Sequence, residues 1–200
     1  AAANCNIGII YYFQGNYSGA IEYYNLAQKE MLELGDKTGV ANSYNNTGII
    51  YLKKGEYPLA LEYFFKALKI REECGDKNGM AAAYNNIGRI YEKSGDNAKA
   101  KEQQFKALKI NEQEDDPGSM ATTLGSLGSI FSKEGDFKKS LEFYLRALEI
   151  REKTGDRHAI ASTNGNIGVI YHEQKNYSNA LAHYQRTLEI MNEIGNKDGV

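Results

Sequence analysis

The chain has 200 residues, a net charge of −2 and 42% hydrophobic residues, which is an ordinary composition for a folded chain. The net charge of each forty-residue block lies between −2 and +1, so no block has the basic surface that nucleic-acid binding requires. No apolar run approaches the roughly 18 residues of a membrane-spanning helix. We therefore expect no nucleic-acid partner and no membrane insertion by this segment.

Few residues here suggest chemistry. Cys5 and Cys74 lack CxxC spacing and occupy unrelated positions, which predicts free thiols rather than a disulfide or a metal site. His158, His172 and His183 are scattered without a partnering nucleophile or metal-ligand spacing, so they are predicted to be isolated surface histidines. We expect no catalytic residue, no metal and no cofactor, and hence no enzyme.

One eight-residue phrase returns every forty residues along the chain. It reads YNNIGRIY at 84–91 and YNNTGIIY at 44–51, with related copies at 4–11, 124–131 and 164–171. A fixed period predicts a repeat array in which each repeat buries its apolar face against its neighbours. We expect one array of five repeats, at 1–40, 41–80, 81–120, 121–160 and 161–200. Ala1 and Val200 are in register with the repeats, so we also expect a segment of a longer protein.

Each repeat is predicted to contain two helices. The first is typified by 76–93, where apolar and small residues follow the three-four spacing of one helix face. Asp76 can cap its start, and Gly95 can end it in the left-handed conformation. The second helix starts after a further capping residue, namely Asn16, Glu56, Asp96, Asp136 or Asn176. It ends at a glycine before Asp or Asn, as at Gly35, Gly75, Gly155 and Gly195. Two antiparallel helices of roughly 17 to 18 residues follow for each repeat.

Small residues mark the places where the two helices should meet. A glycine recurs on the first helix at Gly8, Gly48, Gly88, Gly128 and Gly168. We expect these glycines to face the alanines of the second helix, Ala20, Ala60, Ala100 and Ala180. The tyrosines also recur between repeats and are predicted to be core aromatics. Only Tyr12 has no tyrosine counterpart in another repeat.

These positions resemble the tetratricopeptide repeat. The family places a large residue, Leu-Gly and Tyr at fixed offsets and then Ala-x-x-x-Phe; here Tyr44, Thr47-Gly48, Tyr51 and Ala60-x-x-x-Phe64 correspond. The Ala-x-x-x-Phe part has related copies at Ala20 with Tyr24, Ser140 with Tyr144 and Ala180 with Tyr184. The period of forty rather than 34 is similar to that of kinesin light chain, Pins-type adaptors and bacterial sensory proteins. The resemblance implies an all-α fold, a right-handed α-α superhelix of about ten antiparallel helices.

The resemblance also implies a concave groove lined by the first helix of each repeat. In the first repeat its positions are Ala2, Cys5, Asn6, Ile9, Tyr12 and Phe13, with counterparts at forty-residue steps. Asparagine is a poor helix former, yet it recurs at Asn6, Asn46, Asn86 and Asn166, with Asn42 nearby. Relatives use such a series to hold a peptide backbone, whose donors and acceptors an amide complements. Alternatively, these amides cap or bridge the backbones of neighbouring first helices, which would be an internal structural role.

A second polar series is cationic. Lys53, Lys93 and Lys133 stand near the ends of the first helices, and Arg89 lies one turn before Lys93. They could attract an acidic ligand segment, or the lysines could simply favour the negative end of the helix macrodipole. Both interpretations stay open at this point.

The third and fourth repeats depart from the pattern. Lys101, Gln103 and Gln104 replace Leu61, Tyr63 and Phe64. Asp115-Asp116-Pro117-Gly118 replaces the usual turn, and glycines and serines crowd 125–129. We expect the softest point of the array here, as a hinge, an enlarged groove or simple drift.

The sequence thus predicts a protein-interaction module that binds an extended protein or peptide ligand, with acidic residues facing the cations. Two alternatives remain. The array could be the sensory segment of a bacterial signalling protein whose output domain lies outside this chain. It could also be a scaffold that self-associates end to end, since the end repeats each present a helix face that another repeat would cover.

Overall fold

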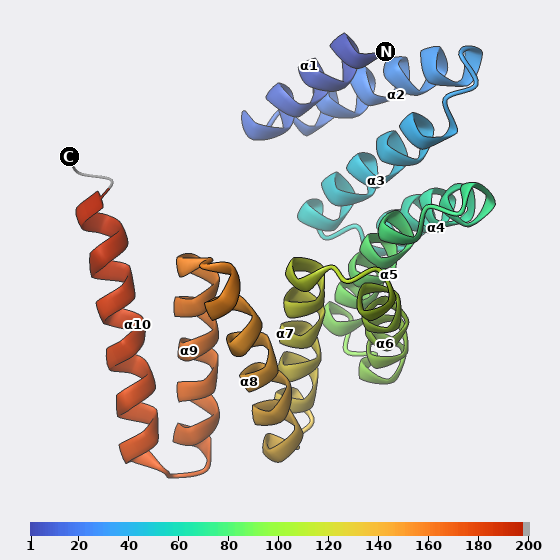
Figure 1. Ribbon diagram of the computed structural model, residues 1–200. Coiled ribbons are helices and arrows are strands. Elements are labelled where there is room, and N and C mark those ends of the chain that lie inside the picture. Colours follow the sequence, from blue (N-terminus) through green and yellow to red (C-terminus); the bar gives the residue numbers. More distant parts are fainter. Residues whose placement is uncertain (198–200) are drawn as a thin grey trace. The chain divides into compact units, whose positions relative to one another are not determined.

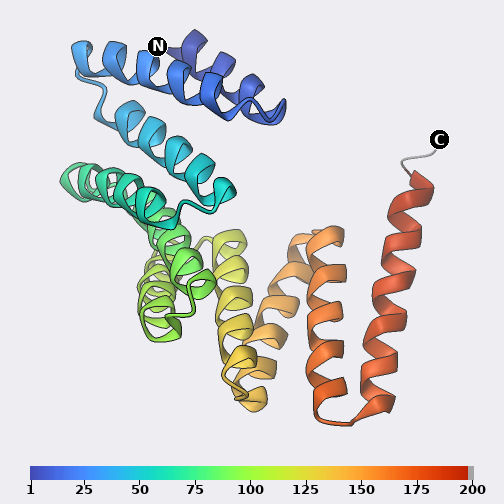
Figure 2. The same cartoon turned by 180° about the vertical axis from the view of Figure 1, so that it is seen from behind.

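The computed structural model describes the backbone of residues 1–197 and the side chains of residues 1–195. Over these residues it contains ten α-helices and no strand (Figure 1). The helices are joined by short turns, which the view from behind shows equally clearly (Figure 2). The predicted fold class, an all-α array of antiparallel helix pairs, is confirmed.

The helices alternate between the two kinds predicted for each repeat. The first helices are α1 (Ala2–Phe13), α3 (Lys37–Lys54), α5 (Lys77–Lys93), α7 (Pro117–Lys133) and α9 (Arg157–Glu173). The second helices are α2 (Tyr17–Glu33), α4 (Tyr57–Cys74), α6 (Asn97–Gln113), α8 (Phe137–Thr154) and α10 (Tyr177–Lys197). From α2 to α9 every helix has 17 or 18 residues, which confirms the predicted length.

The chain divides into two compact units, Ala1–Lys106 and Ala107–Val200. The core of the first unit repeats one contact between successive repeats. Ile50 of α3 packs with Ala20 and Tyr24 of α2, and Ile90 of α5 packs in the same cluster as Ala60 and Phe64 of α4. Each second helix is thus covered by the first helix of the next repeat.

The second unit is built by the same rule. Ile170 of α9 packs with Tyr144 of α8.

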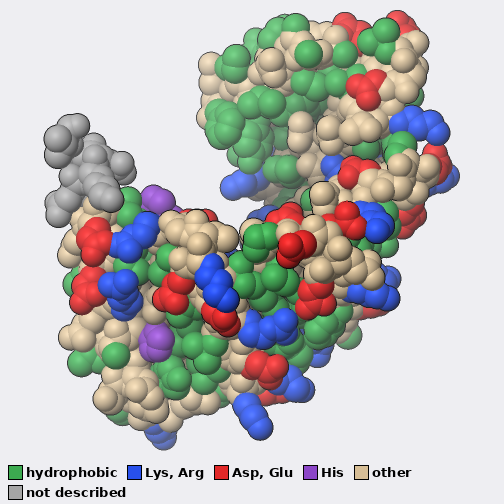
Figure 3. Space-filling model, viewed as in Figure 1, with side chains coloured by type: hydrophobic (Ala, Val, Ile, Leu, Met, Phe, Trp, Pro, Cys, Tyr) green, Lys and Arg blue, Asp and Glu red, His purple; other side chains and the backbone are tan. Residues whose placement is uncertain are grey.

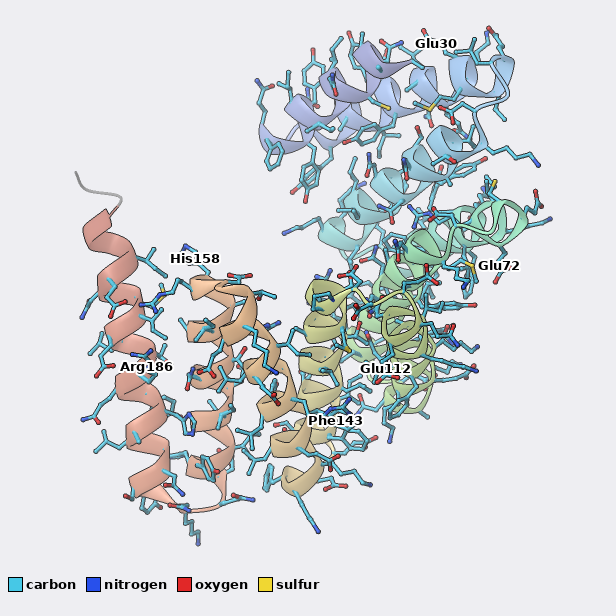
Figure 4. All side chains as sticks on the ribbon, viewed as in Figure 1. Glu30, Glu72, Glu112, Phe143, His158 and Arg186 are labelled. Carbon is cyan, nitrogen blue, oxygen red and sulfur yellow. The ribbon has the colours of Figure 1, made fainter. Side chains whose placement is uncertain are left out.

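Phe143 of α8, labelled in Figure 4, stacks on Phe131 of α7 with ring centroids 5.3 Å apart. Similar ring pairs join Tyr11 to Tyr23, Tyr51 to Tyr63 and Tyr171 to His183 in the other repeats. The predicted role of the recurring tyrosines as core aromatics is therefore confirmed for these pairs.

Helix capping follows the sequence with one exception. The side chains of Asp76, Asp96, Asp136, Asn16 and Asn176 each accept a hydrogen bond from the backbone amide three residues later. Glu56 lies at the capping position of α4 but makes no such bond. The prediction that Glu56 caps the helix with its side chain is wrong, because its longer side chain pairs with Lys54 instead.

The recurring glycines lie against side chains of the following second helix, and a Cβ placed on Gly8 would also lie 3.3 Å from the Ala20 carbonyl oxygen. A Cβ placed on Gly48 would lie 2.9 Å from the Phe64 ring, and one on Gly128 would lie 2.9 Å from the Tyr144 ring. Gly8 and Gly168 face Tyr24 and Tyr184 in the same way. The glycine therefore makes room for a ring one helical turn beyond the alanine position, and the predicted glycine–alanine contact is confirmed for Gly8 and Ala20.

The irregular third and fourth repeats still fold into helices. Asp115 takes a positive φ of 51°, and Lys175 takes one of 60° before α10; glycine supplies this conformation in the remaining turns. Asp116 then caps α7 by accepting from the Ser119 amide at 3.0 Å, with Pro117 at the helix start. Whether this stretch is the softest part of the chain stays a prediction.

One predicted helix end is wrong. Gly195 does not stop the last helix, because α10 continues through it to Lys197. The turn glycines Gly35, Gly75 and Gly155 do adopt positive φ, as predicted.

Candidate functional site

Two adjoining hollows lie on the first compact unit and are lined by residues of α1, α2, α3 and α5. We call the smaller one the apolar pocket. It measures about 180 Å³ and is lined by Ile9, Tyr12, Phe13, Tyr24, Asn46 and Ile49. Burial raises the pKa of the Tyr24 phenol.

We call the larger hollow the cationic pocket. It measures about 360 Å³ and is lined by Tyr12, Ile49, Leu52, Lys53, Asn86, Arg89 and Lys93. Tyr12 and Ile49 line both pockets, so the two form one groove with an apolar part and a charged part. Its combined size is in the range of roughly 300 to 1,000 Å³ that is usual for ligand sites.

The repeat geometry explains why these side chains meet. Ile9, Ile49 and Arg89 occupy one repeat position, and Phe13, Lys53 and Lys93 occupy another, one helical turn later. Successive first helices follow one another along the array, so residues at the same repeat position form a row across the unit. The groove is therefore built from rows of equivalent residues.

The charge of the groove is positive and locally uncompensated. Lys53, Arg89 and Lys93 are exposed, and none of the three forms an ion pair with an acidic side chain of the described residues. Like charges around one hollow repel one another and raise the local positive potential. An anionic group placed there would be attracted.

The macrodipole explanation for the lysines also fits their positions. Lys53, Lys93 and Lys133 all lie in the last turn of their helices, where a cation is favoured. Arg89 lies a turn earlier and does not share this explanation. It lines the same pocket as Lys53 and Lys93, as the ligand interpretation requires.

The asparagines fall into different environments. Asn46 lines the apolar pocket and Asn86 lines the cationic pocket. The Asn86 side chain also donates to the Asn45 side chain, with 3.2 Å between Nδ2 and Oδ1. This bond joins α5 to α3 through side chains, whereas the structural alternative required contact with a helix backbone. The role of the asparagine series therefore stays a prediction.

Asn42 has an internal partner. It accepts a hydrogen bond from Arg71 Nη2 at 3.2 Å, while Arg71 Nη1 donates to the Gly79 carbonyl at 2.6 Å. Burial lowers the pKa of the Arg71 guanidinium, and the Asp76 carboxylate opposes this shift. Asn42 therefore helps to satisfy a buried cation between repeats.

The remaining predicted residues lie elsewhere. Asn6 is exposed on α1, whereas Lys133 and Asn166 are exposed on α7 and α9 of the second unit. The structure thus gathers Asn46, Lys53, Asn86, Arg89 and Lys93 around one groove in the first unit.

The sequence placed the apolar members of the groove at groove-facing positions but did not mark them as ligand-binding residues. These members are Ile9, Tyr12, Phe13, Ile49 and Leu52. Two signals could have identified them. Tyr12 lacks a tyrosine counterpart, and Phe13 stands where the next three repeats have lysine.

One predicted surface histidine proved to be a packed residue. His183 stacks on Tyr171 with ring centroids 5.5 Å apart, and its Nδ1 lies 2.9 Å from Asn164 Oδ1. Desolvation lowers the pKa of His183. The interpretation as an isolated surface histidine is wrong here, because His183 occupies the ring position of Tyr63 and Phe143.

The described residues contain no group of three or more His, Cys, Asp or Glu side chains arranged to hold a metal ion. Throughout the same part of the chain, no helix combines the length and the apolar character needed to cross a bilayer.

The sequence matches the model of one protein family, the tetratricopeptide repeat, at residues 1–73, 40–113 and 119–193. A comparison with curated proteins gives no match.

Solved structures share the fold. BtubC (BKLC) from P. vanneervenii superposes with a TM-score of 0.84 at 23% identity, over 94% of this chain and 78% of that protein. A Rap protein solved with Competence and Sporulation Factor gives a TM-score of 0.82 at 18% identity, over 95% of this chain and 53% of its own. MamA gives a TM-score of 0.67 at 19% identity, over 95% and 97% of the two chains. This chain thus spans about half of the Rap protein.

Three observations indicate the same family: the helix pairs, the glycines that face a ring, and the family match along most of the sequence. The chain belongs to the tetratricopeptide repeat family.

Proposed function

We propose that this chain is a protein-interaction module whose groove binds an extended, acidic segment of a partner protein. The observation that carries the proposal is the cationic pocket, where Lys53, Arg89 and Lys93 surround one hollow without an acidic partner among the described residues. A carboxylate-bearing segment would supply the missing countercharge.

The asparagines support an extended backbone as the ligand. Asn46 and Asn86 line successive parts of the groove, and each amide offers a donor and an acceptor to a peptide group. Asn86 uses one hydrogen through its bond to Asn45, which leaves its second N–H and its carbonyl oxygen for a ligand. The same bond fixes the direction of the Asn86 side chain.

A relative with the same fold supports a macromolecular or peptide-sized ligand. The Rap protein named above was solved as a complex with Competence and Sporulation Factor. This chain has the fold and a groove, so a bound ligand is consistent with its architecture.

The test is a capture experiment from the lysate of the native host. The wild-type chain and the Asn46→Ala/Asn86→Ala variant would be used as baits, with bound proteins identified by mass spectrometry and helicity checked by circular dichroism. We expect a partner that wild type retains and the variant loses at unchanged helicity. An acidic partner should also be lost with Arg89→Glu and kept with Lys133→Glu, a matched change at the end of α7 in the second unit. If the wild-type chain and the Asn46→Ala/Asn86→Ala variant capture the same proteins equally, the groove is not the binding surface.

A second candidate function, self-association, is favoured by the outer face of α10. This face carries exposed hydrophobic side chains at helical spacing, namely Tyr177, Leu181, Tyr184, Leu188 and Met191. Leu188 is 62% exposed, whereas its counterparts Leu68 and Leu108 are each 6% exposed. In the other repeats this face is covered by the first helix of the next repeat, as α9 covers α8.

The helix that would cover α10 in a second copy is α1. Ile10 of α1 is 56% exposed, although Ile50, Ile90 and Ile130 at the same repeat position are 0% exposed. We therefore propose an end-to-end contact of α1 on α10. Light scattering over a range of concentrations should show association of wild type and not of Leu181→Lys/Leu188→Gln, which uses residues found at those positions in other repeats, Lys101 and Gln28. A constant monomer mass for wild type would exclude it.

A further inference from the structure

A third hollow lies in the first unit, where α2 turns into α3, and we call it the turn pocket. It measures about 280 Å³ and is lined by Met31, Leu32, Gly35, Asp36, Lys37, Val40, Ile70 and Glu73. None of these residues lines the groove. The turn pocket lies at the start of α3, whereas Lys53 lines the groove near the end of that helix, about 24 Å away at 1.5 Å per residue.

Part of the turn pocket belongs to the core. Met31 and Val40 are 8% and 3% exposed, and Ile70 packs against them. Packing of the helices therefore explains these three residues, which form the apolar floor. It does not explain Leu32, whose side chain is 61% exposed at the rim.

Leu32 has no apolar counterpart in the other repeats. The same repeat position holds Glu72, Glu112, Glu152 and Asn192. Since those repeats form this helix with a polar side chain there, folding does not require a leucine. Leu34, which precedes the lining residue Gly35, is 76% exposed, and hydrophobic and acidic side chains both appear over this end of α2 at the upper right of Figure 3. Exposed apolar side chains that gather without a packing role indicate a contact surface.

The residue at the floor leaves space in the turn pocket. Met31 occupies the repeat position of Arg71. A Cβ placed on Gly39 would lie 2.6 Å from the Met31 sulfur, and one on Gly79 would lie 2.7 Å from Cδ of Arg71, so the two side chains follow the same path. Arg71 continues and donates from Nη1 to the Gly79 carbonyl at 2.6 Å, whereas Met31 ends one methyl group later. The space that a guanidinium fills in the second repeat is therefore open to a ligand in the first.

The mouth of the turn pocket is acidic. Two carboxylates, those of Asp36 and Glu73, line it beside the single ammonium group of Lys37. Lys37 pairs with Glu73 at 3.6 Å. Asp36 accepts a hydrogen bond from the Gly39 amide at 2.9 Å but forms no ion pair with a residue that the structure describes. The last turn of α2 contains no basic residue, so no cation in that turn offsets the negative end of its macrodipole. A cation would be attracted to this mouth.

We infer that the turn pocket is a second interaction site, which receives one apolar side chain of a partner protein whose neighbouring residue is lysine or arginine. The pocket is smaller than the roughly 300 to 1,000 Å³ of small-molecule sites, so it accommodates one side chain rather than a whole ligand. Such an anchor, surrounded by polar contacts, is the usual centre of a protein interface. This site differs from the groove in its position and in the sign of its charge, and it does not depend on the function proposed for the groove.

The experiment is a peptide titration followed by NMR of isoleucine methyl groups, because each site contains its own isoleucine. Ile70 lines the turn pocket, whereas Ile9 and Ile49 line the groove. The probes are the capped peptide Gly-Lys-Leu-Lys-Gly, its analogue with Ala in place of Leu, and its analogue with Glu in place of both Lys. We expect the leucine–lysine peptide to shift the Ile70 signal saturably, to bind about tenfold more tightly than either analogue, and to leave the Ile9 and Ile49 signals unchanged.

Two variants connect this binding to the turn pocket. Met31→Arg introduces the residue of the second and fourth repeats, whose guanidinium should fill the space beside Asp36; the shift of Ile70 should be lost while circular dichroism shows unchanged helicity. Leu32→Glu introduces the residue of three other repeats and removes the apolar rim, so the preference for the leucine peptide over the alanine analogue should fall from about tenfold to about threefold. Met191→Arg, the matched change at the same repeat position of α10, should leave the titration as in wild type.

Several results would overturn the inference. One is an Ile70 signal that no peptide shifts, and another is equal binding of the leucine peptide and either analogue. A shift of Ile49 in place of Ile70 would assign the peptide to the groove. An unchanged titration of folded Met31→Arg, or a full preference in Leu32→Glu, would place the peptide outside the turn pocket. None of these results bears on the capture of an acidic segment by the groove, which its own variants test.

Discussion

Two helix pairs of the first unit solve the same packing problem with different side chains. In the α3–α4 pair, Gly48 faces the fully buried Phe64, and Tyr63 stacks on Tyr51 at 5.3 Å. Between α5 and α6, Gly88 faces Gln104, which is equally buried. Gln104 donates to the Asn85 carbonyl at 3.3 Å, but its Oε1 has no partner among the described residues.

The difference shows that the glycine and the repeat register determine how the two helices of a repeat pair. The side chain opposite the glycine then decides how stable the helix pair is. An aromatic ring fills the site and needs no hydrogen bond. A buried amide must be satisfied at both ends, and an unsatisfied acceptor costs roughly 1–3 kcal/mol. The α5–α6 pair should therefore be the weaker of the two, and four predictions test this comparison.

The largest effect is expected from making the strong pair resemble the weak one. Phe64→Gln should lower the free energy of unfolding by about 3 kcal/mol or more, because it removes a buried ring and buries an amide. Urea unfolding followed by circular dichroism measures this. Phe65→Gln, at an exposed neighbouring position, is the control and should change stability little. Equal losses for both variants would contradict the role given to Phe64.

A smaller effect should follow from filling the glycine site. Gly48→Leu should cost about 1–3 kcal/mol by overpacking, because the Phe64 ring cannot move away easily. Gly88→Leu should cost less, since it meets the amide end of the flexible Gln104 side chain. Thermal unfolding of the two variants gives the order, and a larger loss for Gly88→Leu would show that α6 is packed more rigidly than its side chains indicate.

The weak pair should also be repairable. Gln104→Phe restores the ring found in α4 and removes the unpartnered amide oxygen, so it should raise the free energy of unfolding by about 1 kcal/mol. The same urea titration reads this change. Destabilisation would mean that the Gln104 bond to Asn85 contributes more than a ring would.

The smallest effect concerns His183, which takes the ring position of Tyr63 in the last repeat. Its pKa is lowered in the folded protein by desolvation, so the unfolded chain binds the proton more readily. The contribution of neutral His183 is present above the ordinary pKa of about 6.5 and is lost as the pH falls below it. Comparing thermal unfolding across this range, wild type should lose slightly more stability towards acid than His183→Phe. Parallel curves would refute the linkage.

Most of the fold could be read from the sequence. The forty-residue period, the three-four spacing of apolar residues, and the glycine and capping residues predicted ten helices. The predicted length is correct for α2 to α9, whereas α1 has 12 residues and α10 has 21. These features are local, because helix formation and capping depend on residues within one or two turns of one another. The exceptions are local too: Glu56 is too long to cap, and Asp115 takes a conformation that glycine usually supplies.

Less of the candidate site could be predicted. The sequence selected Asn46, Asn86, Lys53, Lys93 and Arg89, which do line the groove. It placed Ile9, Tyr12 and Phe13 at groove-facing positions but did not select them as binding residues, because an apolar residue gives the same signal whether it packs against the protein or contacts a ligand. Exposure of the side chain separates the two cases, and exposure is a property of the folded chain.

The sequence by itself determined the period, the helices and the family, because every repeat satisfies the same short-range packing rules. Only the tertiary structure decided which residues of different repeats meet. It placed aromatic rings against four of the five recurring glycines, paired Asn42 with Arg71 and Asn86 with Asn45, and placed Tyr12 between an apolar and a cationic pocket. The glycine–ring contacts and the asparagine hydrogen bonds join residues that lie 16 to 41 positions apart in the sequence. Their formation depends on side-chain shape and hydrogen-bond geometry in three dimensions rather than on spacing along one helix.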